Sequence, residues 1–291
     1  MINFSKFSKQ IIIANYICII FILGLVFIHG INMGIDFTGG ITIELSSTDT
    51  IELSHMKQIM PKNFSIQNIT DDKHVLIHLK AQPDTNIDLL IKNVKHNLEN
   101  TYNNISYQRI EYVGPSIGRD LMFSGIVALF CAMFGMFIYL TIRFNLYFAI
   151  GGIQALFNDI ITIIGFFSIS NIEFGAPSIA ALLTIIGYSI NDSVVIFDRI
   201  RENLKKRHKN TMEIINDSLN STLKRTMLTS LTTLFAVAVL IFFTHGTISN
   251  FSWPMFVGII TGTFSSVFIA PLIPIKCSIN SKNTLKTDNI N

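Results

Sequence analysis

Six stretches of the chain are almost wholly apolar, and each is long enough to cross a lipid bilayer as a helix. A span needs about 20 apolar residues, because the hydrocarbon core is about 30 Å thick and a helix rises about 1.5 Å per residue. The pattern therefore predicts a polytopic α-helical membrane protein with six transmembrane helices. The predicted ranges are 11–30, 121–142, 146–169, 178–197, 227–244 and 254–275.

The segment between the first two spans, residues 31–119, has the composition of a soluble domain. Apolar and polar residues alternate in ITIELS, VLIHLK and ISYQRIEYV, which is typical of strands, and FSIQNI adds a further strand. Apolar residues recur at helical spacing in IELSHMKQIM and NIDLLIKNVKHNLENTY. The order strand, helix, hairpin, helix, strand predicts a small α+β domain resembling the ferredoxin-like split βαβ arrangement.

Composition supports a membrane protein. The chain is 49% hydrophobic and only 14% charged, whereas a soluble domain carries about 25% charged residues. After the short segment 1–10, the first apolar run is longer than the roughly 7–15 residues of a signal peptide, so we expect a retained helix. The three cysteines lie far apart in the sequence, which predicts neither a disulfide framework nor a metal site.

Basic residues gather on one side of the predicted spans. By the positive-inside rule, this side is the cytoplasm. The loops SNIEFGAP and HGTISNFSW on the other side contain no Lys or Arg. We therefore expect both termini in the cytoplasm and residues 31–119 outside it. The basic residues are Lys6, Lys9 and Arg143, then Arg199, Arg201, Lys205, Lys206, Arg207, Lys209, Lys224 and Arg225, and finally Lys276, Lys282 and Lys286.

Segment 198–225 mixes its basic residues with four acidic ones, which argues against a nucleic-acid partner. The spacing of Met212, Ile215 and Leu219 predicts an amphipathic helix that lies against the cytoplasmic membrane surface. The polar, Asn-rich tail 276–291 is predicted to be disordered.

Asp192 lies inside the fourth predicted span, between Asn191 and Ser193. A charge at the centre of a bilayer costs about 2.5–3.5 kcal/mol, so such a residue normally faces a partner, a bundle interior or water. Arg225 begins the fifth span, and helix rise places it at a depth similar to that of Asp192. The two side chains are therefore candidates for a pair.

Small and polar residues form a stripe on each of these two helices. On the fourth span the stripe includes Gly187 and Asn191, beside Tyr188, and on the fifth it continues from Arg225 through Thr229 and Thr232. Because small residues let helices approach closely, we expect the stripes to face each other. One interpretation is a proton relay, in which Asp192 exchanges between a protonated form and an ionised form paired with Arg225. A static ion pair that only fixes helix packing is the alternative.

Two further carboxylates have less certain roles in the sequence. Asp159, in the third span, is either a second relay member or a hydrogen-bonding partner of a neighbouring Ser or Thr. Asp36 follows the first span in MGIDFTGG, where the surrounding glycines favour a tight turn and a capping role over a relay role.

Four motifs in this chain resemble the SecF members of the SecD/SecF family, in the resistance-nodulation-division superfamily. They are GIDFTGG, VGPSIGRDL, IGYSINDSVVIFDRIREN and LNSTLKRTMLTSLTTL, and the resemblance runs from about Ile11 to Ile275. It implies a multi-pass protein of the bacterial inner membrane. It also implies a complex with SecD, YajC and the SecYEG channel, into which the SecA motor pushes secreted polypeptides.

The resemblance further implies that the assembly uses the proton gradient to promote the late movement of those polypeptides. Protons would be the coupling ion, with no other cofactor and no enzymatic activity. In this family the functional carboxylate lies in the fourth span and its basic partner in the fifth. These positions fall on Asp192 of YSINDS and Arg225 of LKRTMLTS.

Three other functions compete with this interpretation. A purely structural partner of SecD would use Asp192 only to lock helix packing. An intramembrane aspartyl protease would use Asp159 and Asp192 as a dyad, although the GxGD signature is missing because the second site reads SIND. A stand-alone drug exporter of the superfamily has twelve spans, twice the number predicted here.

Overall fold

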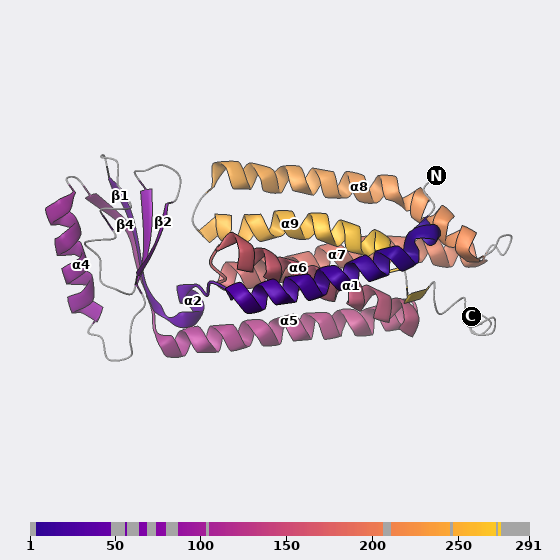
Figure 1. Cartoon of the computed structure of the whole chain (residues 1–291), viewed down its shortest axis with the longest axis horizontal. Helices are drawn as coiled ribbons and strands as arrows, with labels where there is room; N and C mark the ends of the chain where they lie inside the picture. The colour runs from indigo at the N-terminus through magenta and orange to yellow at the C-terminus, as the bar shows by residue number, and fades with distance from the viewer. Residues whose placement is uncertain are drawn as a thin grey trace.

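Six long helices form a bundle, and a small α+β domain lies beyond one end of it (Figure 1). All six are long and apolar enough to cross a membrane, which confirms the predicted fold class. They are α1 (Phe4–His29), α5 (Pro115–Arg143), α6 (Leu146–Ser170), α7 (Ala176–Lys205), α8 (Thr211–Phe243) and α9 (Thr247–Phe268). The computed structural model describes residues 4–47, 56, 64–68, 74–79, 87–102, 105–205, 211–244, 247–271 and 273–274.

Helices α6, α7 and α9 form the centre of the bundle. About half of each apolar segment is buried inside the protein, whereas α1, α5 and α8 expose most of theirs. Glycines allow the central helices to approach closely. A Cβ atom on Gly151 of α6 would lie only 2.3 Å from the backbone oxygen of Ala270. The central helices are therefore fixed by packing against protein, and the outer three are left to face lipid or a partner.

The α+β domain (residues 40–113) contains four antiparallel strands in the order β2-β3-β1-β4. This order, with helix α4 (Ile87–Thr101) between β3 and β4, agrees with the predicted ferredoxin-like arrangement. The predicted helix IELSHMKQIM lies outside the described residues apart from Met56. The strands are β1 (Gly40–Ser47), β2 (Phe64–Asn68), β3 (His74–Leu79) and β4 (Ile105–Val113).

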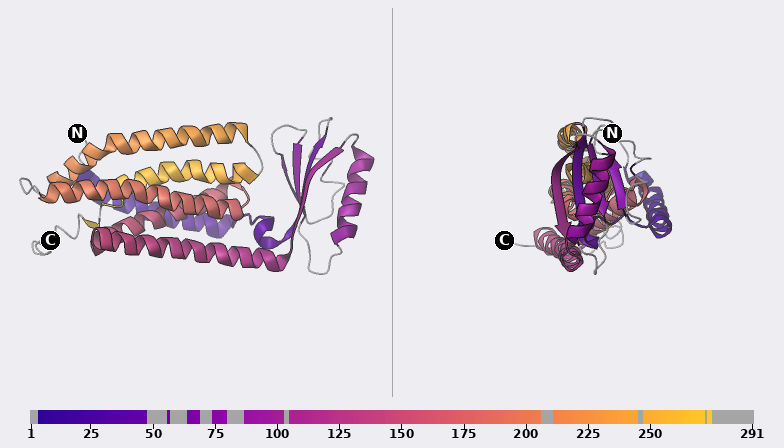
Figure 2. Two further views of the ribbon diagram at one scale, coloured as in Figure 1. Left: turned by 180° about the vertical axis from the view of Figure 1, so that it is seen from behind. Right: turned by 90° about the vertical axis from the view of Figure 1, so that its left-hand side faces the viewer.

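One face of the sheet packs on α4, and the opposite face is turned toward the bundle (Figure 2). Ile41, Ile43 and Leu45 of β1 form the core with Val94 and Leu98 of α4. Because side chains alternate along a strand, the residues between these apolar positions lie on the face nearer the bundle.

Several helix ends differ from those predicted. Helix α5 begins at Pro115, so the α+β domain ends before the predicted residue 119. Helix α9 begins at Thr247 and ends at Phe268, seven residues earlier at each end than the predicted 254–275. Its first two turns are polar, and Ser252 donates to the Ile248 oxygen at 2.8 Å. An apolar run cannot reveal turns of this kind.

The predicted surface helix in segment 198–225 is instead the continuation of two spans. Helix α7 extends to Lys205, and α8 is helical from Thr211. The amphipathic pattern is present, but Ile215 and Leu219 pack on the buried cluster that contains Phe197 and Ile200. Their apolar face is therefore covered by protein, and the predicted placement against the membrane surface is wrong.

Candidate functional site

Asp192 lies on the inner face of α7, where it is 3% exposed and its Oδ2 atom has no hydrogen-bond partner among the described residues. Its neighbours Ser189 and Ser193 are also buried. Asn191, which directly precedes Asp192, is exposed. The structure thus places the costly carboxylate inside the bundle, as the sequence predicts for a residue of this kind.

Arg225 does not form the predicted close pair in this structure. Its side chain is exposed on α8, and the ion pairs of the described residues do not include one with Asp192. Its charge nevertheless lies within electrostatic reach of that carboxyl. The adjacent Thr226 is buried instead, at 1% exposed, and its hydroxyl has no hydrogen-bond partner within the described segments.

The predicted facing stripes lie on the outside of the free chain. Gly187 and Thr232 are exposed, whereas Tyr188 and Thr229 are partly buried, and a Cβ atom on Gly187 would meet no atom within 4 Å. The expectation that the stripes face each other is wrong. The polar residues that α8 buries are instead spaced four apart. They are Ser218, Thr222, Thr226 and Ser230. In the sequence, this set is shifted by one position from the predicted stripe that includes Arg225.

Asp159 of α6 is brought into contact with α7. Its side chain is 1% exposed, and the Ser189 hydroxyl donates to its Oδ2 atom at 2.7 Å. Its Oδ1 atom has no hydrogen-bond partner among the described residues. Ser189 is three residues before Asp192 on α7, so the residue that binds Asp159 lies about one helical turn from Asp192.

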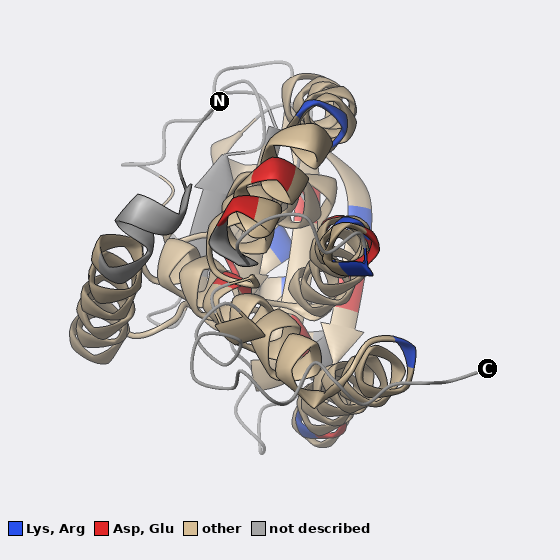
Figure 3. Cartoon of the chain, turned by 90° about the vertical axis from the view of Figure 1, so that its right-hand side faces the viewer, with Lys and Arg blue, Asp and Glu red and all other residues tan. Residues whose placement is uncertain are grey.

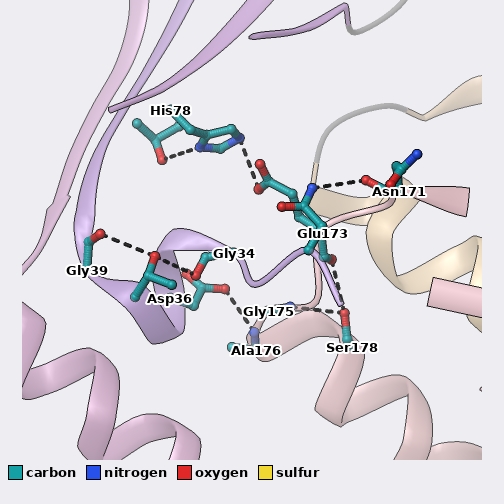
Figure 4. A network of polar contacts seen from close by, with 12 residues as sticks. Gly34, Asp36, Gly39, His78, Asn171, Glu173, Gly175, Ala176 and Ser178 are labelled. Atoms are coloured by element: carbon teal, nitrogen blue, oxygen red, sulfur yellow. Dashed lines mark hydrogen bonds and ion pairs between the residues drawn. The ribbon is translucent and has the colours of Figure 1, made fainter. Parts of the chain in front are cut away.

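Asp36 lies far from this site and caps α7 (Figure 4). Its Oδ2 atom accepts a hydrogen bond of 2.9 Å from the backbone nitrogen of Ala176, the first residue of the helix. A carboxylate there satisfies a free N–H group and complements the helix dipole. Sixteen residues, about 24 Å of helix, separate Ala176 from Asp192, so the structure supports the capping role. The capping residue, however, comes from the segment that leads into the α+β domain.

A second contact between the α+β domain and the bundle is absent from the sequence prediction. His78 of β3 places its Nε2 atom 3.2 Å from Glu173 Oε2, in the loop between α6 and α7, and its Nδ1 atom 3.1 Å from Thr42 Oγ1 (Figure 4). Burial lowers the pKa of His78 to about 4, and the negative charge of Asp36 opposes this only in part. The neutral ring can accept at Nδ1 from the Thr42 hydroxyl. Its Nε2 atom lies beside the carboxylate but makes no hydrogen bond among the described residues. No local sequence signal marks this pairing.

Figure 3 views the bundle from the end remote from the α+β domain, with the ribbon positions of Lys, Arg, Asp and Glu coloured. Arg143 pairs with Asp198 at 2.9 Å, and Arg199 pairs with Glu202 at 2.6 Å. Within the described parts of the chain, no group of three His, Cys, Asp or Glu side chains has a geometry that suits a metal ion. The polar groups of the site are buried carboxyls and hydroxyls.

Comparisons with known proteins agree with these features. Residues 93–279 match the family described as "Protein export membrane protein SecD/SecF, C-terminal", and residues 24–51 match the "SecD/SecF GG Motif". The SecF translocase subunit of Rickettsia bellii is 42% identical over 94% of this chain and 91% of its own length. That of Calditerrivibrio nitroreducens is 40% identical over 92% of this chain and 91% of its own length.

Solved structures show the same fold. The crystal structure of SecDF from Thermus thermophilus, a translocon-associated membrane protein, superposes with a TM-score of 0.86 at 32% identity and covers 96% of this chain. SecDF in its super-membrane-facing form gives a TM-score of 0.72 at 32% identity and covers 98% of this chain. The present chain spans about two fifths of those SecDF chains, 39% and 40%. By sequence over nearly its full length, and by fold, the chain belongs to the SecF family of protein translocase subunits.

Proposed function

We propose that this protein is a SecF subunit of the Sec export machinery, and that with SecD it uses the proton gradient to promote the late movement of secreted polypeptides. Its partners would be SecD, the SecYEG channel and YajC, acting after the SecA motor. The coupling ion would be the proton, with no other cofactor. The relatives carry the names of translocase subunits, and we propose no enzymatic activity.

The observation that carries this proposal is the state of Asp192. Its carboxyl is buried, one of its oxygens has no hydrogen-bond partner in the part of the chain that the structure describes, and Arg225 lies within electrostatic reach from an exposed position. An ionised carboxylate is costly in such a place unless a cation approaches it. The protonated form needs no cation. Binding or release of one proton therefore favours two different arrangements of α7 and α8.

The outer end of α7 offers a route from that proton to the α+β domain. Asp36 caps the helix, and the loop before it holds Glu173 against His78 of the sheet. A shift of α7 is thus passed to the domain through both contacts. A membrane potential supplies about 2.3 kcal/mol per charge per 100 mV, which is enough to bias two orientations that differ by a few kcal/mol.

SecD fits the surface that the bundle leaves open. The small and polar residues Thr184, Gly187 and Asn191 of α7 are exposed in the free chain, where lipid is a poor neighbour for polar groups. In the SecDF structures this fold is only part of a longer chain. We place SecD against this face and the assembly in the bacterial inner membrane. By the positive-inside rule, the basic residues at the far end favour a cytoplasmic location for that end and for both termini.

Replacing Asp192 by Asn tests the proposal, because it keeps the shape of the side chain and removes its titration. In inner-membrane vesicles that contain SecD, we expect Asp192→Asn to keep ATP-driven export and to lose the increment that a proton gradient adds. Asp198→Asn is the matched control, since Asp198 lies on the same helix but is about half exposed and paired with Arg143. It should export as the unmodified protein does.

Copurification with SecD distinguishes the proton-relay role of Asp192 from a purely structural packing role. If Asp192→Asn weakens the complex with SecD, the residue is a packing element. If the variant assembles and its export still responds fully to the gradient, the proton-relay assignment is wrong.

A further inference from the structure

Asp159 is a second buried carboxyl that the proposed cycle has not used. It is the sole charged residue of α6, and it lies where α6, α7 and α9 meet. Ser189 of α7 donates to its Oδ2 atom at 2.7 Å. A Cβ atom on Gly262 of α9 would lie 3.5 Å from the same oxygen. Ser265 of α9 and Asn158 of α6 also place polar side-chain groups within hydrogen-bonding reach of the carboxyl.

The helices around Asp159 provide no positive charge to balance an ionised form. Helices α6 and α9 contain no Lys, Arg or His, and α7 contains none between Ala176 and Phe197. The titratable groups of α7 nearest in sequence to Ser189 are Tyr188 and Asp192. Helix α1 brings Tyr16 to Gln154, five residues before Asp159. A buried carboxylate without a cation is costly, so an ionised Asp159 would readily accept a proton.

A purely structural carboxyl would be expected to use both of its oxygens. Buried polar atoms in proteins are nearly always hydrogen-bonded, and exceptions call for an explanation. Asp159 binds Ser189 through Oδ2, yet its Oδ1 atom is buried and without a partner among the described residues. This leaves one oxygen available to hold a proton.

We propose that Asp159 is a second proton-binding carboxyl on the same route as Asp192, and that the Ser189 hydroxyl connects the two. This inference rests on the proposed function. Residues three apart on a helix are neighbours, with Cβ atoms about 5–6 Å apart. In this proposal a single bound water would bridge the remaining gap between Asp192 and Ser189.

The transfer balances without another reactant. The carboxylic acid of Asp192 gives its proton to the water, which passes one of its own to the Ser189 oxygen. Ser189 in turn donates its hydroxyl hydrogen to an ionised Asp159. Asp192 is left as a carboxylate within reach of the charge of Arg225, Asp159 becomes neutral, and the water and the serine are unchanged.

Infrared spectroscopy of the complete chain in complex with SecD, in lipid, tests this directly. The carbonyl stretch of a protonated carboxyl is separate from that of a carboxylate, and it is followed here over a pH titration. We expect Asp159→Asn and Asp192→Asn each to remove a different part of this signal, and the double variant to remove both parts. Asp198→Asn, an exposed carboxyl of α7, should remove none.

Two outcomes overturn the inference. One is an Asp159→Asn spectrum that matches that of the unmodified protein at every pH. The other is that Asp192→Asn alone removes everything that the double variant removes. If Asp159→Asn does not assemble, Ser189→Ala is used instead. Loss of the 2.7 Å hydrogen bond should shift the frequency of the Asp159 band without removing it, and an unshifted band contradicts the proposal.

The spectra are read independently of export. If Asp192→Asn leaves gradient-driven export intact, the proposed function fails, whatever the infrared result. If export fails in Asp192→Asn and the Asp159 signal is absent, only the second carboxyl is wrong.

Discussion

Four buried polar atoms in the described part of the membrane bundle lack a hydrogen-bond partner. They are Asp159 Oδ1, the Tyr188 hydroxyl, Asp192 Oδ2 and Thr226 Oγ1. Each unsatisfied buried group costs about 1–3 kcal/mol. They occur on three helices, and a bundle selected only for stability would replace them with apolar residues. At the scale of single residues, we infer that these costly groups are kept because protonation of a buried carboxyl changes the helix packing around it.

His78 provides a test of a single side chain outside the membrane. Its ordinary pKa of 6.5 falls to about 4 because it is buried, so the folded protein binds this proton less readily than the unfolded chain. The stability that His78 contributes is complete above pH 6.5 and is lost as the pH falls toward 4. Linkage predicts a loss of about 2 kcal/mol between pH 7 and pH 5.

The measurement is the Tm of the purified full chain in detergent at these two pH values. His78→Gln keeps a polar side chain near Glu173 but does not titrate, so its Tm should fall less on acidification. His96→Gln, on the exposed face of α4, should behave as the unmodified protein. Equal acid sensitivity of the unmodified protein and His78→Gln would show that His78 is not buried in its neutral form.

At the scale of elements, α7 joins the two parts of the molecule. Its inner end extends beyond the predicted span and packs on α8 through Ile200 and Leu219. Its outer end begins under the carboxylate of Asp36. Asp192 lies between the two ends. A change in its charge therefore acts on a helix that is held at both ends by protein rather than by lipid.

The cap on α7 makes a prediction that separates the two roles considered for Asp36. Asn caps helices about as well as Asp, whereas Ala does not, at a typical cost of about 1 kcal/mol. We expect Asp36→Asn to retain both stability and gradient-driven export, and Asp36→Ala to lower the Tm. Thermal unfolding and vesicle export on the same preparations provide the measurement. An Asp36→Asn variant that is stable but unresponsive to the gradient would place Asp36 in the proton route.

The sequence predicts some elements closely because their signals are local. Helix α6 occupies almost the predicted range, since an apolar run follows Asn145, whose side chain accepts from Phe148 N and begins the helix. The four strands follow from alternation. Burial of Asp192 follows from the cost of an exposed charge in a membrane.

Other features depend on contacts that no local pattern contains. In the first turns of α9, which the apolar run does not cover, the Ser252 hydroxyl is satisfied by the Ile248 oxygen one turn earlier. The choice of Thr226 over Arg225 as the buried residue of α8 is a rotation of one position, about 100°, and it is set by packing on α7 and α9. The pairing of His78 with Glu173 joins residues that are remote in the sequence.

At the scale of the whole molecule, the chain is elongated. The α+β domain lies at one end and the extended ends of α7 and α8 at the other, with the buried carboxyls in the bundle between them (Figures 1 and 2). The two contacts of Asp36 and His78 connect the outer end of the bundle to the domain. We therefore expect the α+β domain to move and Asp192 to carry the proton.

The central claim is that the charge of Asp192 sets the orientation of the α+β domain, and one distance tests it most directly. Fluorescent labels on Asn93→Cys of α4 and Thr247→Cys of α9, with the native cysteines replaced by Ser, report the separation of the domain and the bundle. In vesicles that contain the complex with SecD, we expect the distance distribution to change when a proton gradient is applied, and to stay fixed in Asp192→Asn. A distribution that ignores the gradient in the unmodified protein, or responds equally in Asp192→Asn, would contradict the account.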